Sequence, residues 1–271
     1  MSCFVFTQHT PMKLKRNDII LLATTLIAVV AVFQLPPIGQ PPAFHLFADG
    51  RTILGIRNFW NVCSNLPFLV IAIYGFITLG KRKNPLATNL IYSTLFLGVA
   101  LTAFGSGYYH SNPNSHTLVW DRMPLTIIFI SFTCAIIADF INERLGLYLL
   151  GPLVLTGVGS VLWWDYTQTA GHGDLRLYML VQYYPMVAIP LILWLYYRPS
   201  LKPMIGPIVW VVVWYVIAKL FERWDLPIYK TLGISGHTLK HLAAAASTWY
   251  FIEVYKRSIP ATPAGMPAAR G

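Results

Sequence analysis

Three histidines, one serine and one aspartate lie at the ends of apolar segments of this chain. His237 and His241 begin the last apolar segment, and His110 ends an earlier one, four residues after Ser106. Asp121 follows at the head of the next apolar segment. Polar, ionisable side chains at membrane depth are energetically costly, so they usually mark a functional site. These five residues are therefore the candidate site.

Their types and spacing predict metal-assisted hydrolysis. Residues i and i+4 share one face of a helix, so His237 and His241 can bind one ion, and Ser106 shares a face with His110 in the same way. Three neutral imidazoles form an open zinc site, which keeps a position for water and lowers the pKa of that water to about 7. Asp121 could pass the proton of this water to a leaving group, and Ser106 could stabilise an oxyanion or orient the water.

Each residue also has an ordinary explanation. Two histidines at this spacing can be hydrogen-bonded interfacial residues, Ser106 can serve helix packing, and Asp121 can cap the next helix. His116 is expected to be a solvated residue of the loop 111–120, and His9, His45 and His172 receive no role. Three histidines at one expected depth favour the metal site over these explanations.

The composition indicates a polytopic membrane protein. Of the 271 residues, 56% are hydrophobic and only 11% are charged, and the mean hydropathy is +0.56. A soluble domain would carry about a quarter charged residues. The net charge of +10 does not indicate a nucleic-acid partner, because the Lys and Arg residues lie in short loops between apolar segments, where they set orientation. The three cysteines are scattered and have no CxxC spacing.

A membrane-spanning helix needs about 20 mainly apolar residues. The sequence offers eight such segments, which predicts an all-α helical bundle: 18–36, 60–79, 87–109, 122–140, 147–164, 177–197, 204–221 and 237–255. The first could be a signal peptide, but no small-residue cleavage site follows it, so we expect a retained anchor. An interfacial aromatic belt is expected to contain Tyr108, Tyr109, Trp120, Trp163 and Trp164.

Eight spans place both termini on one side of the membrane. That side would carry twelve of the 20 Lys and Arg residues, which predicts cytoplasmic termini. His110, Asp121, His237 and His241 would then all lie at the opposite end, toward the lumen, periplasm or exterior.

Three stretches of the chain resemble the alkaline ceramidases, a family of seven-helix intramembrane zinc hydrolases related to progesterone/adiponectin-receptor-like proteins. The first is the stretch 58–65, Asn-Phe-Trp-Asn-Val-Cys-Ser-Asn. The second is Gly-Ser-Gly-Tyr-Tyr-His at 105–110 with Trp-Asp-Arg-Met-Pro at 120–124, and the third is Gly-His-Thr-Leu-Lys-His at 236–241. The resemblance covers about residues 45–256.

The resemblance implies His110, His237 and His241 as zinc ligands and Ser106 and Asp121 as catalytic partners. It also implies a seven-helix hydrolase domain at 45–256, preceded by a cytoplasmic arm at 1–17 and an extra transmembrane helix with linker at 18–44. A disordered tail is expected at 257–271. Animal members share an acidic Ca²⁺-binding segment before the first core helix. Here Asp49 is the one acidic residue in that region, beside Arg51, Arg57 and Asn58, so a second metal site at Asp49 is weakly indicated.

The expected function is zinc-dependent cleavage of the N-acyl amide of a ceramide-like membrane lipid, which gives a sphingoid base and a fatty acid. Hydrolysis of another N-acyl or ester lipid is the nearest alternative, since the metal centre does not distinguish these substrates. A zinc-containing lipid receptor or sensor is a second alternative. A transporter is disfavoured, because the sequence has no paired discontinuous helices in two symmetric halves.

Overall fold

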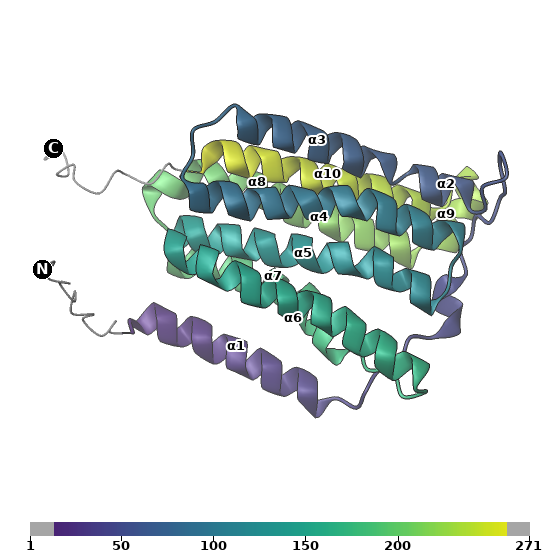
Figure 1. Cartoon of the computed structure of the whole chain (residues 1–271), viewed down its shortest axis with the longest axis horizontal. Helices are drawn as coiled ribbons and strands as arrows, with labels where there is room; N and C mark the ends of the chain where they lie inside the picture. Colours follow the sequence, from purple (N-terminus) through teal and green to yellow (C-terminus); the bar gives the residue numbers. More distant parts are fainter. Residues whose placement is uncertain (1–13, 259–271) are drawn as a thin grey trace, which may run out of the picture.

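The computed structural model describes residues 14–258, which fold into a bundle of helices with no β-strand (Figure 1). This confirms the predicted all-α membrane bundle. The expected N-terminal arm and C-terminal tail fall largely at 1–13 and 259–271, outside the described residues. The helices are α1 (Arg16–Gln34), η1 (Pro42–His45), α2 (Phe59–Cys63), α3 (Leu66–Gly80), α4 (Leu86–Ser111), α5 (Ser115–Phe140), α6 (Glu143–Thr169), α7 (Arg176–Leu195), η2 (Pro199–Leu201), α8 (Lys202–Arg223), α9 (Asp225–Leu232) and α10 (Gly236–Arg257).

Within the described chain, seven helical stretches are long and apolar enough to cross a bilayer, which indicates an integral membrane protein. They correspond to the first seven predicted spans, with α2 and α3 together forming the second. The eighth predicted span is present as α10, which has 22 residues but is less apolar than the others. It packs along α8 and α3 inside the bundle (Figure 1), and it carries two of the three site histidines.

Successive helices run in opposite directions, so α1 begins and α10 ends at the same end of the bundle (Figure 1). The first helix lies at the edge, packs mainly on α7 and contributes no buried residue. We call the helices α2 to α10 the core of the bundle. At the far end of the core, α4 ends, α5 begins and α10 begins, which brings together the segments that carry the site residues.

Two sequence-based boundaries at this end were wrong. The expected loop 111–120 is shorter, because Asn114 caps α5 and its side chain accepts a hydrogen bond from the backbone of Thr117. His116 therefore lies in the first turn of α5 rather than in a loop. Asp121 lies well inside α5, so it is not a helix cap.

Small residues let the helices approach closely where the site forms. A Cβ atom on Gly105 would lie 2.0 Å from the backbone oxygen of Trp120. Only glycine therefore allows α4 to come this close to α5, and the contact brings the following residues of the two helices, Ser106 and Asp121, to the same level. In membrane proteins, small residues at helix interfaces serve this purpose.

We predict that Gly105→Ala lowers stability by about 1–3 kcal/mol, because the added methyl group forces α4 away from the α5 backbone. Thermal unfolding of the detergent-solubilised protein measures this effect. Gly159→Ala is the matched control, since a Cβ there meets no atom within 4 Å. Equal midpoints for the two variants would contradict the close packing.

Candidate metal centre

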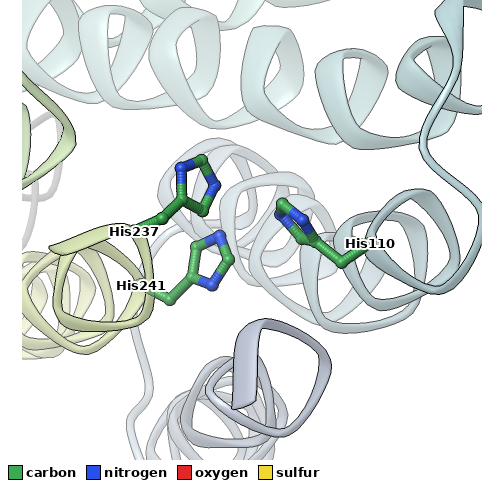
Figure 2. A group of neighbouring side chains, drawn as sticks. All are labelled: His110, His237 and His241. Atoms are coloured by element: carbon green, nitrogen blue, oxygen red, sulfur yellow. The ribbon is translucent and has the colours of Figure 1, made fainter. Parts of the chain in front are cut away.

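The three predicted ligands form one buried cluster. His110, His237 and His241 are 1%, 6% and 4% exposed, and their rings turn toward a common space between α4 and α10 (Figure 2). One nitrogen from each ring lies within 4.8 Å of the others. A point within about 2.8 Å of all three nitrogens therefore exists, and small ring rotations would reach the 2.0–2.1 Å typical of zinc. The sequence-based grouping of these histidines is confirmed.

The start of α10 is held firmly, which fixes two of the three rings. Ser235 caps the helix by accepting a hydrogen bond from the backbone of Thr238 at 3.1 Å. The carboxylate of Asp225 accepts a second hydrogen bond, from the backbone of His237 at 3.0 Å. Asp225 begins α9, a helix that the sequence analysis did not predict, so this short helix positions the metal centre.

A hydrogen bond from Ser64, which directly follows α2, sets the orientation of the His241 ring. The Ser64 hydroxyl lies 2.8 Å from Nδ1 of His241 and also donates to the backbone oxygen of Asn61 at 3.1 Å. When Ser64 donates to Asn61, its oxygen accepts from a protonated Nδ1 of His241, because a hydroxyl has one hydrogen. Nε2 of His241 is then unprotonated and free to bind a metal. Such outer hydrogen bonds usually fix the tautomer of a ligating histidine.

The same segment joins α10 to α4. The side-chain oxygen of Asn61 accepts hydrogen bonds from Thr238 at 2.7 Å and Ser235 at 3.3 Å, while Asn58 donates to the backbone oxygen of His110 at 2.8 Å. Sequence reasoning quoted this stretch only for its resemblance and missed these roles. The sequence did carry a signal for these roles, because polar side chains in an otherwise apolar segment need hydrogen-bond partners.

The donor set fits a transition metal. Nδ1 of His110 and Nε2 of His237 are buried and have no hydrogen-bond partner within residues 14–258. Unpaired buried nitrogens are costly, and a metal ion would satisfy them. Three imidazoles suit zinc and neighbouring divalent metals, and the cluster of three leaves a fourth position open.

Ser106 and Asp121 lie on the neighbouring helices α4 and α5. Ser106 is buried one helical turn before His110, and its hydroxyl faces the carboxyl group of Asp121, with which it can hydrogen-bond. Asp121 in turn lines a cavity of about 340 Å³. The three histidines and Ser106 are not part of the cavity lining, so among the five candidate residues Asp121 alone borders the cavity.

The cavity lies among α5, α7, α8 and α10, and its walls are mostly apolar. Phe132, Ile189 and Phe251 are typical of its lining. Its volume falls in the range of small-molecule sites. The consecutive helices α7 and α8 both contribute to these walls.

The segment between α1 and α2 covers the metal centre. The backbone oxygen of Ile38 accepts a hydrogen bond from Leu175 at 2.9 Å, and the backbone of Ala48 donates to Asp225 at 2.9 Å. Between these anchors, the ring of Phe47 lies 4.7 Å from that of His110 and 4.6 Å from that of His237, centre to centre. Nothing in the sequence pattern singled out Phe47, because an isolated aromatic residue in a linker has no periodic signal.

Asp49, the predicted second metal site, forms an ion pair with Arg51. Arg51 donates to both carboxylate oxygens of Asp49, and these hydrogen bonds hold the pKa of Asp49 below its usual range. A Ca²⁺ ion would have to displace the guanidinium group. The structure therefore gives no support for the Ca²⁺ prediction.

Comparison with known proteins does not assign this chain to a family. No protein-family model matches the sequence, and no curated protein matches it either. The resemblance to alkaline ceramidases therefore stays a prediction that rests on the three motifs.

We predict that Ser64→Ala weakens metal binding about 10–100-fold, because His241 loses the partner that sets its tautomer. Competition with a chromophoric chelator measures the affinity of the purified protein. Ser111→Ala is the control, since that hydroxyl donates only within its own helix, to Tyr108. If both variants bound metal as tightly as the unmodified chain, Ser64 would have no role in the site.

Proposed function

We propose that this protein is an intramembrane zinc-dependent amidohydrolase that cleaves the N-acyl amide of ceramide-like lipids. The observation that supports it most is the buried cluster of three histidines, with Ser106 one helical turn before His110 and Asp121 on the wall of an apolar cavity. The products would be a sphingoid base and a fatty acid.

When bound, the zinc ion supplies Lewis-acid activation of water and of the substrate carbonyl. Side chains of the protein would transfer the proton and stabilise the developing negative charge. Asp121 takes a proton from the attacking water and delivers it to the leaving amine. Ser106 donates its hydroxyl hydrogen to the oxygen that becomes negatively charged. The covering ring of Phe47 excludes bulk water, which strengthens these polar interactions.

A lipid reaches this site from the membrane. The cavity walls are apolar, and α7 and α8 both line them, so an acyl chain fits among these helices. The exposed side chain of Tyr183 on α7 also lines the cavity and marks this side of the bundle.

A receptor or sensor that keeps the metal for structure alone is the alternative of a different class. Structural zinc sites are usually closed by a fourth protein ligand. Here the cluster has three ligands, and Ser106 and Asp121 face each other where α4 meets α5. This arrangement favours chemistry over a purely structural role, while another N-acyl or ester lipid remains the nearest alternative substrate.

We predict that Asp121→Asn lowers turnover by about 10²–10⁴-fold, because the proton shuttle is lost. Ser106→Ala lowers it by about 10²-fold through loss of the oxyanion donor. Both variants keep their zinc. Mass spectrometry of the products from a panel of N-acyl lipids, with metal analysis of each sample, measures both effects. Asp165→Asn is the control, as this carboxylate pairs with His116 outside the cavity. Normal turnover of both site variants would refute the assigned roles.

We propose further that the termini are cytoplasmic and that the metal centre faces the lumen, periplasm or exterior. Lys81, Arg82 and Lys83 lie in one short loop at the end of the bundle opposite the histidines. Such clusters favour the cytoplasmic side.

Cysteine labelling tests this orientation. In a chain without its native cysteines, a cysteine at Lys83 should be protected from an impermeant reagent in intact cells. A cysteine at His116, whose side chain is 72% exposed, should react. Permeabilised cells, in which both positions should react, are the control. The reverse labelling pattern would place the metal centre on the cytoplasmic face.

A further inference from the structure

A bridge of three charged side chains lines the polar end of the cavity. One oxygen of Glu222 accepts a hydrogen bond from Lys219 at 2.8 Å, and the other accepts one from Lys240. Lys219 and Glu222 come from α8, and Lys240 comes from α10. A single carboxylate thus neutralises two ammonium groups only in part, and the bridge keeps one positive charge.

The two ammonium groups also have unused hydrogen-bond donors. Each carries three N–H groups, and within residues 14–258 each donates to Glu222 alone. Their side chains keep 35% and 21% exposure, and both line the cavity. Four donors and one unbalanced charge therefore border a largely apolar space. Such a charge is costly unless a counter-ion pairs with it.

A third cation strengthens the positive character of this end. Arg122 lines the same cavity and is 6% exposed. Its guanidinium donates to Gln40 and lies 4.2 Å from the ring centre of Trp164, but it has no carboxylate within 4.0 Å in the part of the chain described. The cavity lining thus holds three cations, Arg122, Lys219 and Lys240, against two carboxylates, Asp121 and Glu222.

We infer that the Lys219–Glu222–Lys240 bridge binds an oxyanion on the polar head of the lipid, so that among ceramide-like N-acyl lipids the protein binds those with an anionic head group more tightly than the neutral ones. This inference rests on the proposed function for the N-acyl bond of the ligand. The charge preference itself rests on the bridge. Asp121 lies within electrostatic range of Lys240, so a head group at the bridge would hold the neighbouring amide near Asp121.

Binding of two matched probes tests the inference. N-oleoylglycine and N-oleoylethanolamine share one acyl chain and one amide, but only the first carries a carboxylate. Affinities are measured by microscale thermophoresis on the zinc-loaded Asp121→Asn protein, which consumes neither probe. We expect the anionic probe to bind about tenfold or more tightly, as charge-assisted hydrogen bonds imply. Equal affinities would overturn the inference without any further variant.

Charge variants then show which residues cause the preference for the anionic probe. In the same Asp121→Asn background, Lys219→Gln should weaken N-oleoylglycine binding about tenfold and leave N-oleoylethanolamine unchanged. Glu222→Gln should act in the opposite direction, since both ammonium groups lose their shared counter-ion. Lys230→Gln is the matched control, because this exposed lysine of α9 lies outside the cavity. A preference that survives Lys219→Gln would place the oxyanion elsewhere, for example on the metal, and would overturn the inference.

Oleate is the third probe, because the released fatty acid also carries a carboxylate. Lysine-dependent binding of oleate without a preference between the two amides would assign the bridge to the product and overturn its assignment to the head group. Turnover of ceramide by the unmodified protein is measured in parallel. If the protein prefers the anionic probe but does not hydrolyse ceramide, the result would support the bridge and refute the proposed function. If it hydrolyses ceramide but binds both amide probes equally, the result would support the proposed function and refute the bridge.

Discussion

The hydrogen bond between Ser64 and His241 is the interaction on which the geometry of the metal centre most depends. It sets which nitrogen of His241 can bind a metal, and it connects α2 to α10 across an otherwise apolar bundle. Asn58 and Asn61 extend this connection to the end of α4 and the start of α10. A helix bundle in a membrane cannot rely on water to satisfy such groups, so these contacts must be made within the protein.

The interface between α4 and α5 imposes a second constraint. Ser106 and Asp121 belong to different helices, and they meet because Gly105 allows the α4 backbone to lie against Trp120. The three histidines and the Ser106–Asp121 pair are thus positioned by different contacts. One set joins the segment 58–64 to α10 and to the end of α4, and the other joins α4 to α5.

The histidine cluster was predictable because its evidence is local. His237 and His241 are four residues apart, and an alternating order of spans places His110 at the same depth. The start of α5 was missed, because the capping contact between Asn114 and Thr117 shifts it by several residues into a polar stretch. Sequence periodicity detects the apolar part of a helix and not its polar first turns.

Other features depend on pairs that are distant in the chain. Trp164 was expected in an interfacial belt but is fully buried, because it packs against the guanidinium of Arg122. The bridge from Lys240 to Glu222 likewise requires α8 and α10 to lie side by side. Neither pair has a spacing that a sequence pattern would show, so only the folded arrangement reveals them.

The covering segment bears on which molecules can reach the histidines. Phe47 contacts two of the three rings, and it also lines a second hollow of about 470 Å³ with residues of the α8–α9 junction such as Trp224. Its ring therefore stands between this hollow and the metal centre. A molecule that moved from this hollow to the histidines would have to displace the ring, which neighbours the hydrogen bond from Ala48 to Asp225, and Asp225 also holds the start of α10. Asp121 lines the other cavity, among α5, α7, α8 and α10, whose lining includes neither Phe47 nor Asp225, so a molecule in that cavity would meet Asp121 without disturbing these contacts.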